Sequence, residues 1–346
     1  MSNDDLRNSL ASLMRGESLS RVEANHLLDG LLDSDSTDAQ IAAVLIALKL
    51  KGETVEELAG LAEGMRARSV RIHSRHSRFI DTAGTGSSCA KTFNVSTAAA
   101  FVIAGAGLPV AKHGNRAASS RCGSADVLAA LGVNVSAPSE ISEKCLNEIG
   151  ICFMFAPLYH GATARVAGIR RELGVPTTFN LLGPLTNPAG APRQVIGVSE
   201  HRFVQPMARA LALLGTERAW VVHGEDGLDE VTIAGTTFVA EARDGEVKAF
   251  EIEPEDFGFE RAVLEGLTGG DAEGNALIIS DVLSGARRDQ ARMLVVANAA
   301  AALSVGGLAE DLVAAAQLAE QSIDSGAAYR MLEELIERTN EAKGQS

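Results

Sequence analysis

The sequence predicts an α/β protein: a small all-helical N-terminal domain, and a large α/β domain with a central, mostly parallel sheet flanked by helices. The first observation is a recurrence of helix-capping spacings within residues 1–68. The second begins at Phe79, where short apolar runs start to alternate with Gly-rich turns and Ala-rich segments, as in an α/β sheet. The third is the length of 346 residues, enough for one large or two modest domains.

The composition argues against nucleic acid and membranes as binding partners. The chain has 31 Lys and Arg against 45 Asp and Glu, a net charge of −14, which argues against a broad surface for nucleic acid. The uncharged stretch at residues 97–111 is too short and too rich in Gly and Ala to span a bilayer. The first residues carry no secretory signal, and the four cysteines show no CxxC spacing. We expect a cytoplasmic protein with reduced thiols and no membrane or nucleic-acid partner.

Three capping boxes mark helix starts near the N-terminus. They pair Ser20 with Glu23, Thr37 with Gln40, and Thr54 with Glu57. Apolar residues at helical spacing follow the second box and end before Gly52, a helix-terminating residue: Ile41, Val44, Leu45 and Leu48. We expect residues 1–68 to form the small domain, residues 66–78 to be a basic connector, and residues 79–340 to form the large domain.

Elements of the large domain are expected from runs of apolar residues and Ala-rich segments. The expected strands are residues 79–81, 109–112, 133–135, 152–155, 195–198 and 219–223. The expected helices are residues 96–106, 124–131, 139–149, 162–173 and 202–214, followed by a helical C-terminal third. Two β-rich runs around Arg243, Asp244 and Gly245 predict a hairpin within residues 236–253.

The segment from Asp81 to Gly107 predicts a phosphate site. A strand leads into a loop with Gly84 and Gly86, and an Ala-rich helix then begins near Asn94, Ser96 and Thr97. Unpaired N–H groups at a helix start, with the helix dipole, attract phosphate. The spacing matches neither the P-loop nor the Rossmann fingerprint. An ordinary strand-to-helix turn uses the same residue types, so this loop alone leaves both interpretations open.

Two further loops follow expected strands. The first brings Lys112, His113, Asn115 and Arg116 before the expected helix start at Ser124, a set suited to a second phosphate or a polar acceptor. Solvated loop charges are the alternative. The second places Asp229 and Glu230 side by side, and paired carboxylates hold Mg²⁺ when substrate phosphates complete its shell. Taken alone, an acidic turn is more often simply solvated.

Several motifs together resemble a known family. They are GTG-x₅-TFNVSTAAAF, KHGNRAASS-x₃-SADVLAALG, FAPLYHGATARVAGIRRELG, FNLLGPLTNPAG and HGEDGLDE. Their order and spacing resemble anthranilate phosphoribosyltransferase of tryptophan biosynthesis across nearly the whole chain. That family shares its fold with the pyrimidine nucleoside phosphorylases, which have a different loop in place of KHGNR. The resemblance implies a pentosyl-transferring glycosyltransferase that moves phosphoribosyl from phosphoribosyl pyrophosphate to the amine of anthranilate and needs Mg²⁺, with two ions expected.

The resemblance also implies residue roles. Phosphoribosyl pyrophosphate would be bound by Gly84, Ser87, Ser88, Thr92, Asn94, Val95, Ser96, Thr97, Lys112, His113, Gly114, Asn115, Arg116, Ala117, Ala118, Ser119, Ser120 and Ser124. Anthranilate would be bound by Gly84, His113, Asn115, His160 and Arg170. Metal would be held by Ser96, Asp229 and Glu230. No residue is assigned as acid or base, since the aromatic amine is already unprotonated at neutral pH. The family further implies a homodimer through the helical domain, which helices near residues 162–190 would join.

Two departures from the family pattern bear on this expectation. The family usually reads GTGGDG in the first loop, where this chain has Ser87, Ser88 and Cys89, and it usually has Pro where this chain has Gly161. The changed first loop motivates one alternative, a related phosphoribosyltransferase or phosphorylase that uses a different acceptor. A nucleic-acid binder is disfavoured by the net charge of −14. A nucleophilic role for Cys89 rests on motif chemistry alone.

Overall fold

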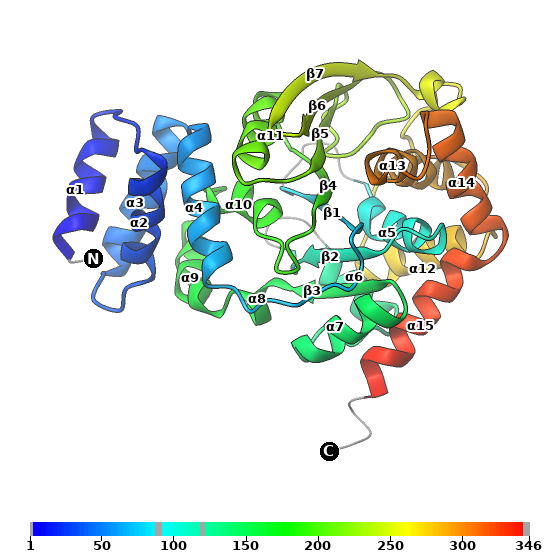
Figure 1. Ribbon diagram of the computed structural model, residues 1–346, viewed down its shortest axis with the longest axis horizontal. Coiled ribbons are helices and arrows are strands. Elements are labelled where there is room, and N and C mark those ends of the chain that lie inside the picture. The colour runs from blue at the N-terminus through cyan, green and yellow to red at the C-terminus, as the bar shows by residue number, and fades with distance from the viewer. Residues whose placement is uncertain (1–2, 87–91, 118–121, 342–346) are drawn as a thin grey trace.

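Four N-terminal helices form a bundle that stands beside the sheet (Figure 1). The structure is a computed structural model that describes residues 3–86, 92–117 and 122–341. The bundle comprises α1 (Asn3–Met14), α2 (Arg21–Leu32), α3 (Asp38–Lys51) and α4 (Val55–Ala67). All three expected capping boxes are confirmed, with both reciprocal hydrogen bonds formed at the start of α2, α3 and α4. α3 ends at Gly52, whose φ of 87° is costly for residues with a Cβ.

A seven-stranded sheet forms the centre of the molecule. Its strands are β1 (Ile80–Gly84), β2 (Val110–Gly114), β3 (Ile151–Phe155), β4 (Arg193–Gly197), β5 (Arg218–Gly224), β6 (Thr237–Arg243) and β7 (Glu246–Ile252). The order is β3-β2-β1-β4-β5-β6-β7, with β1 to β5 parallel and β6 and β7 antiparallel. The expected α/β class with a mostly parallel sheet is confirmed.

Helices cover both faces of the sheet (Figure 1). One face packs against helices that include α5 (Val95–Gly105), α6 (Ser124–Ala130), α7 (Ser139–Glu148), α12 (Ala272–Leu283), α13 (Gln290–Gly306), α14 (Leu312–Asp324) and α15 (Ala327–Glu341). On the bundle side lie α9 (Ala164–Leu173), α10 (Phe179–Leu185) and α11 (Val204–Leu213), and α8 (Ala156–Tyr159) follows β3 directly. Short 3₁₀ turns span Gly161–Thr163, His201–Phe203 and Pro254–Phe257.

Side chains of β5 point alternately into two hydrophobic cores, one on each face of the sheet. Ala219 and Val221 point into the core shared with the bundle, whereas Trp220 and Val222 point into the core beneath α5 and α13. Successive strand residues face opposite sides of a sheet, so residues 219–222 of β5 must all be apolar to be covered on both faces. The bundle is therefore packed continuously against one face of the sheet.

The expected hairpin is confirmed, and one expected strand is wrong. β6 and β7 are joined by Asp244 and Gly245, whose φ angles of 52° and 83° are those of a tight hairpin turn. Residues 133–135 form no strand. Val133 and Val135 are buried at 4% and 7% exposure, but their turn follows α6 and pairs with no strand. Their β-branched side chains are explained by core packing alone.

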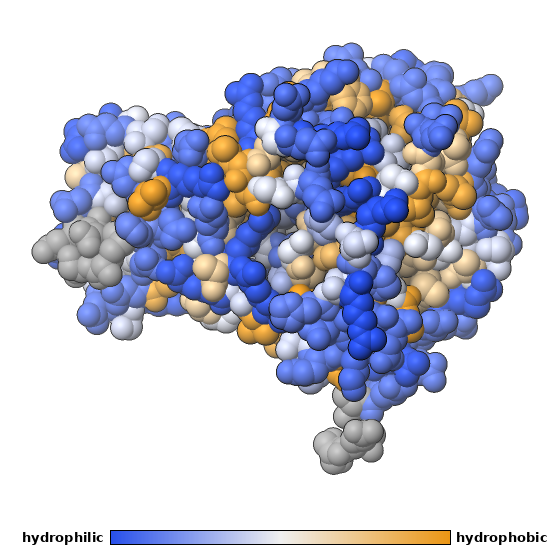
Figure 2. Space-filling view, viewed as in Figure 1, coloured by the Kyte–Doolittle hydropathy of each residue, from blue (hydrophilic) through white to orange (hydrophobic). Residues whose placement is uncertain are grey.

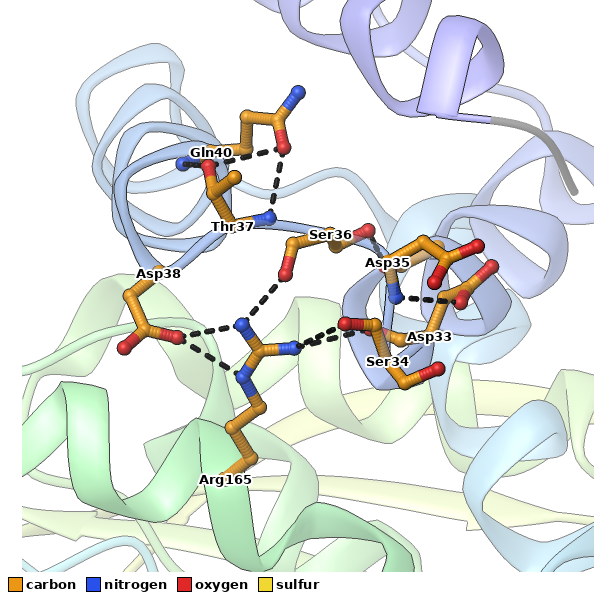
Figure 3. Close-up of polar contacts among 9 residues, drawn as sticks. Asp33, Ser34, Asp35, Ser36, Thr37, Asp38, Gln40 and Arg165 are labelled. Carbon is orange, nitrogen blue, oxygen red and sulfur yellow. Dashed lines mark hydrogen bonds and ion pairs between the residues drawn. The ribbon is translucent and has the colours of Figure 1, made fainter.

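Arg165 fastens α9 to the turn between α2 and α3 (Figure 3). Its Nε and Nη2 donate to Asp38 Oδ1 at 2.9 and 2.7 Å. Its remaining donors reach main-chain carbonyls of the same turn, with Nη1 at 3.1 Å from Asp33 O and Nη2 at 2.5 Å from Ser36 O. One guanidinium thus joins two segments more than a hundred residues apart in the sequence.

The visible surface is largely hydrophilic with scattered hydrophobic patches (Figure 2). The most exposed large apolar side chains include Met14 at 76% and Leu50 at 82%, both on the bundle. Within the described residues, no helix is both long and apolar enough to cross a membrane.

Candidate active site

A cavity of about 410 Å³ opens at the carboxyl ends of β1 and β2, beside the α9–α10 segment. The chain leaves β1 for β2 on one side and returns to β4 on the other, so the strand order reverses at β1. Ligands of open parallel sheets bind at such a reversal, outside the carboxyl ends of the strands. Met65 of α4 also lines the cavity, which therefore touches the bundle.

The loop after β1 forms one wall of the cavity. Five of the residues expected there line it: Gly84, Thr92, Asn94, Ser96 and Thr97. Thr97 Oγ1 is buried and has no hydrogen-bond partner among the described residues, so the hydroxyl is available to a ligand. Val95 is buried in the core at 1% exposure and does not line the cavity. Ser87 and Ser88, together with Cys89, lie outside the described residues.

The carboxyl end of β2 and the loop after it form the adjoining wall. The expected residues that line it are Lys112, His113, Gly114, Asn115, Arg116, Ala117 and Ser124. Ala118, Ser119 and Ser120 lie outside the described residues. Lys112 is buried, and its Nζ donates to Thr82 O at 2.5 Å and lies 3.4 Å from Ser96 Oγ. Burial lowers the pKa of Lys112 despite the opposing effect of Asp81 and Glu230.

Asp229 and Glu230 enter the same cavity from the loop that follows β5. Glu230 Oε1 accepts a hydrogen bond from Ser96 N at 3.2 Å, so the three expected metal ligands lie together at the start of α5. Burial, and then the charge of Asp229, raise the pKa of Glu230. No group of three or more His, Cys, Asp and Glu side chains suited to a metal occurs in the part of the chain that the structure describes.

Two glycines make room for this acidic loop. A Cβ on Gly197 of β4 would lie 1.6 Å from Asp229 O and 2.4 Å from Asp229 C, both main-chain atoms. A Cβ on Gly84 would lie 3.2 Å from Asp229 Oδ2. The position of the carboxylates therefore depends on close packing of the loop against bare backbone at the ends of β1 and β4.

Arg170 lines the same cavity from near the end of α9. Its Nη2 donates to Asn180 Oδ1 at 3.1 Å, and its guanidinium lies 5.5 Å from the centre of the Phe179 ring. Its Nε is buried with no hydrogen-bond partner among the described residues, and none of their carboxylates pairs with it. Burial lowers the pKa of Arg170. A partly buried cation without a counter-charge is suited to an anionic ligand.

Two histidines also line the cavity. The rings of His113 and His160 are 5.1 Å apart, and His113 Nδ1 lies 3.2 Å from Gly183 O. Both Nε2 atoms are buried with no partner among the residues described. Burial lowers the pKa of His113 to about 3 and that of His160 to about 4, so both rings are neutral at pH 7. They offer polar edges without adding charge.

Comparison with known proteins identifies the family. The model described as "Glycosyl transferase family, a/b domain" matches residues 76–329, and "Glycosyl transferase family, helical bundle domain" matches residues 7–69. The anthranilate phosphoribosyltransferase of Anaeromyxobacter sp. strain K is 53% identical over 334 residues, covering 96% of this chain and 98% of that protein. The chain belongs to the anthranilate phosphoribosyltransferase family. The resemblance inferred from the motifs is confirmed, and with it the class of pentosyl-transferring glycosyltransferase.

Solved members of the anthranilate phosphoribosyltransferase family have the same fold. The crystal structure of the Thermus thermophilus enzyme is 40% identical, with a TM-score of 0.90 over 96% of this chain and 99% of that one. The Saccharomyces cerevisiae enzyme in complex with phosphoribosyl pyrophosphate and Mg is 29% identical, with a TM-score of 0.89 over 98% and 99%. The same yeast enzyme is also known with 4-fluoroanthranilate, at a TM-score of 0.87 and 28% identity.

Sequence reasoning missed several residues of this cavity. Met65, Phe179 and Asn180 line it, although none of them was expected there. The segment FNLLGPLTNPAG indicated membership of the anthranilate phosphoribosyltransferase family, but nothing in the sequence around Asn180 indicates a role for that residue in binding. Met65 lies on a helix of the bundle, and the packing of α4 on α10 and α11 brings it near the sheet.

Proposed function

We propose that this chain transfers the phosphoribosyl group of phosphoribosyl pyrophosphate to the amine of anthranilate, with release of pyrophosphate, in tryptophan biosynthesis. The observation that carries the proposal is Arg170, a cation without a carboxylate partner among the described residues, facing a wall of phosphate-binding character. The names of the relatives, and the yeast complexes with phosphoribosyl pyrophosphate and with 4-fluoroanthranilate, support it.

The donor substrate is assigned to the wall made by the loops after β1 and β2. The Thr97 hydroxyl near the start of α5 and the buried Lys112 would hold its phosphates. Departure of pyrophosphate builds negative charge on the leaving group, and fixed donors aimed at that charge lower the barrier. At the phosphoribosyl pyrophosphate site the protein would thus bind the substrate and stabilise the negative charge on the departing pyrophosphate.

Magnesium is assigned to Ser96, Asp229 and Glu230, with two ions expected. The raised pKa of Glu230 fits a metal site, because a divalent cation would offset the repulsion between adjacent carboxylates. Two carboxylates leave most of an octahedral shell to phosphate oxygens and water, which is how Mg²⁺ binds with phosphate substrates. Bound there, the ion would neutralise charge on the departing pyrophosphate.

The acceptor is assigned to the Arg170 end of the cavity. The anthranilate carboxylate would pair with Arg170, while Asn115, His113 and His160 would line the path of its ring. Because both histidines have lowered pKa values and are neutral, neither repels Arg170 nor neutralises the carboxylate. An aromatic amine is unprotonated at neutral pH, so orientation toward the ribose carbon does the work that a base would otherwise do.

Assembly and domain organisation complete the proposal. We assign residues 1–68, joined by helices near 162–190, to a small domain, and residues 79–340 to the domain that binds phosphoribosyl pyrophosphate. The protein would be a cytoplasmic homodimer formed through the helical domain. The exposed apolar side chains of Met14 and Leu50 support an interface on the bundle.

The test is the loss of anthranilate fluorescence on mixing purified protein with anthranilate, phosphoribosyl pyrophosphate and Mg²⁺. We expect turnover that stops when the metal is chelated and resumes when Mg²⁺ is restored. A panel of other aromatic amines and of inorganic phosphate serves as the comparison. Turnover of another acceptor without turnover of anthranilate would replace the proposed acceptor, and no turnover of any acceptor would remove the proposal.

A further inference from the structure

Asn180 holds Arg170 in place by a carbonyl oxygen that two donors share. Its Oδ1 accepts hydrogen bonds from Arg170 Nη2 at 3.1 Å and from the main-chain N–H of Thr177 at 3.0 Å. Both donors are N–H groups, so the amide must present oxygen to them and turn Nδ2 the other way. The contact also closes the turn between α9 and α10, because Thr177 lies in that turn.

These contacts fix the orientation of Arg170 and leave its positive charge without a counter-ion among the described residues. The Phe179 ring lies 5.5 Å from the guanidinium carbon, and Asn180 takes one of its N–H groups. Arg170 Nε stays buried and unpartnered among the described residues. An amide accepts the hydrogen bond as a neutral group, whereas a carboxylate in its place would form an ion pair and cancel the positive charge.

The amide also leaves a donor in the cavity. Asn180 lines the cavity beside Arg170, and no hydrogen bond of its Nδ2 to any described residue occurs. A carboxylate bound to Arg170 would therefore meet a second N–H donor from the same residue that orients the arginine. Aspartate, the nearest isostere, would remove this donor and add a negative charge at the same point.

We propose that Asn180 is a specificity-determining residue, which orients Arg170, leaves its charge unpaired, and thereby selects acceptors that carry a carboxylate. The inference rests on the proposed function, because it takes Arg170 to be the residue that meets the acceptor's carboxylate. It goes beyond that function by assigning the preference for an anionic acceptor to a pair of residues rather than to the arginine alone.

The experiment compares two acceptors that differ in charge, anthranilate and its uncharged analogue 2-aminobenzamide. The readout is the ratio of their kcat/KM values, because a merely structural defect lowers both values together and leaves the ratio unchanged. The variants are Asn180→Asp, Asn180→Ala and Arg170→Gln. The matched control is Arg171→Gln, which changes the net charge by the same −1 as Asn180→Asp, at an exposed position of α9, the helix that carries Arg170.

We expect the ratio to fall about tenfold or more in Asn180→Asp, as for the loss of a charge-assisted hydrogen bond, and less in Asn180→Ala. The control should keep the ratio of the unchanged protein. An unchanged ratio in both Asn180 variants, with a lowered ratio in Arg170→Gln, would overturn the role of Asn180 and keep the proposed acceptor site. If Asn180→Asp does not fold, the Asn180→Ala ratio decides. An unchanged ratio in Arg170→Gln would instead refute the acceptor site itself.

Discussion

Gly197 is a position where one added methyl group should disturb both the stability of the fold and the metal dependence of turnover. In Gly197→Ala the new Cβ would lie 1.6 Å from Asp229 O, where ordinary contact begins at 3.4 Å, so the two must separate by about 1.8 Å, which is 3.4 minus 1.6. Both partners are main chain, in a strand paired on both sides and in a packed loop, so neither can rotate away. The acidic loop, which carries Asp229 and Glu230, is expected to move.

The expected cost of Gly197→Ala is that of overpacking, about 1–3 kcal/mol of folding free energy. Displacement of the acidic loop should also raise the Mg²⁺ concentration needed for half-maximal turnover, because that loop carries the assigned ligands. The assay is a Mg²⁺ titration of initial rate, together with a thermal melt. Gly168→Ala is the matched control, because Gly168 lies within α9 with no atom within 4 Å of an added Cβ. A Gly197→Ala protein with unaltered Mg²⁺ dependence and melting temperature would refute this reasoning.

Three further predictions concern stability. The pKa of His160 is lowered from 6.5 to about 4, so between these pH values the unfolded chain binds a proton that the folded chain does not. The free energy of unfolding should therefore fall as the pH drops from 6.5 toward 4. The variant His160→Gln should show a smaller fall in urea melts. Arg165→Ala should cost about 1–2 kcal/mol, since its pair with Asp38 is partly exposed but its carbonyl contacts are lost as well. Glu57→Ala removes one partner of a buried ion pair and should cost about 3–5 kcal/mol by denaturant melts.

Each of these predictions has its own contrary result. An equal pH dependence in the His160→Gln protein would mean that this ring does not titrate differently on folding. Arg171→Ala, on the exposed side of α9, should be neutral, so equal losses in the Arg171 and Arg165 variants would dismiss the link between α9 and the bundle. Glu56→Ala is the control for Glu57, because it removes an exposed carboxylate from the same helical turn.

Local interactions made much of the bundle predictable. Thr37 and Gln40 satisfy each other's backbone N–H groups, so the helix start depends on residues only three apart. The turn at Asp244 and Gly245 is equally local, because both residues adopt the positive φ angles that a tight hairpin needs. By contrast, Val133 and Val135 have β-branched side chains but no strand beside them, and a strand needs a partner that local sequence does not reveal.

The candidate site was predictable where charged residues lie at or just after the end of an expected strand. Lys112 lies near the carboxyl end of β2 and Asp229 in the loop after β5, and the carboxyl ends of parallel strands gather at one edge of the sheet. Arg170 was assigned only through the family resemblance, since its helix also carries the exposed Arg171. Asn180 was not assigned a role, because its meaning depends on the turn that brings it back to Arg170. Such side-chain pairings form only in the tertiary structure, and they leave no recognisable spacing in the sequence.

The central claim is that one cavity holds two substrates at separate ends, the donor near Asp229 and the acceptor near Arg170. The most direct measurement is the KM of each substrate in Arg170→Gln and in Asp229→Asn, at saturating concentration of the other. We predict that Arg170→Gln raises the KM for anthranilate about tenfold or more while leaving that for phosphoribosyl pyrophosphate nearly unchanged, and that Asp229→Asn does the reverse. If both variants raise the same KM, or if neither KM changes, the two-ended site is contradicted.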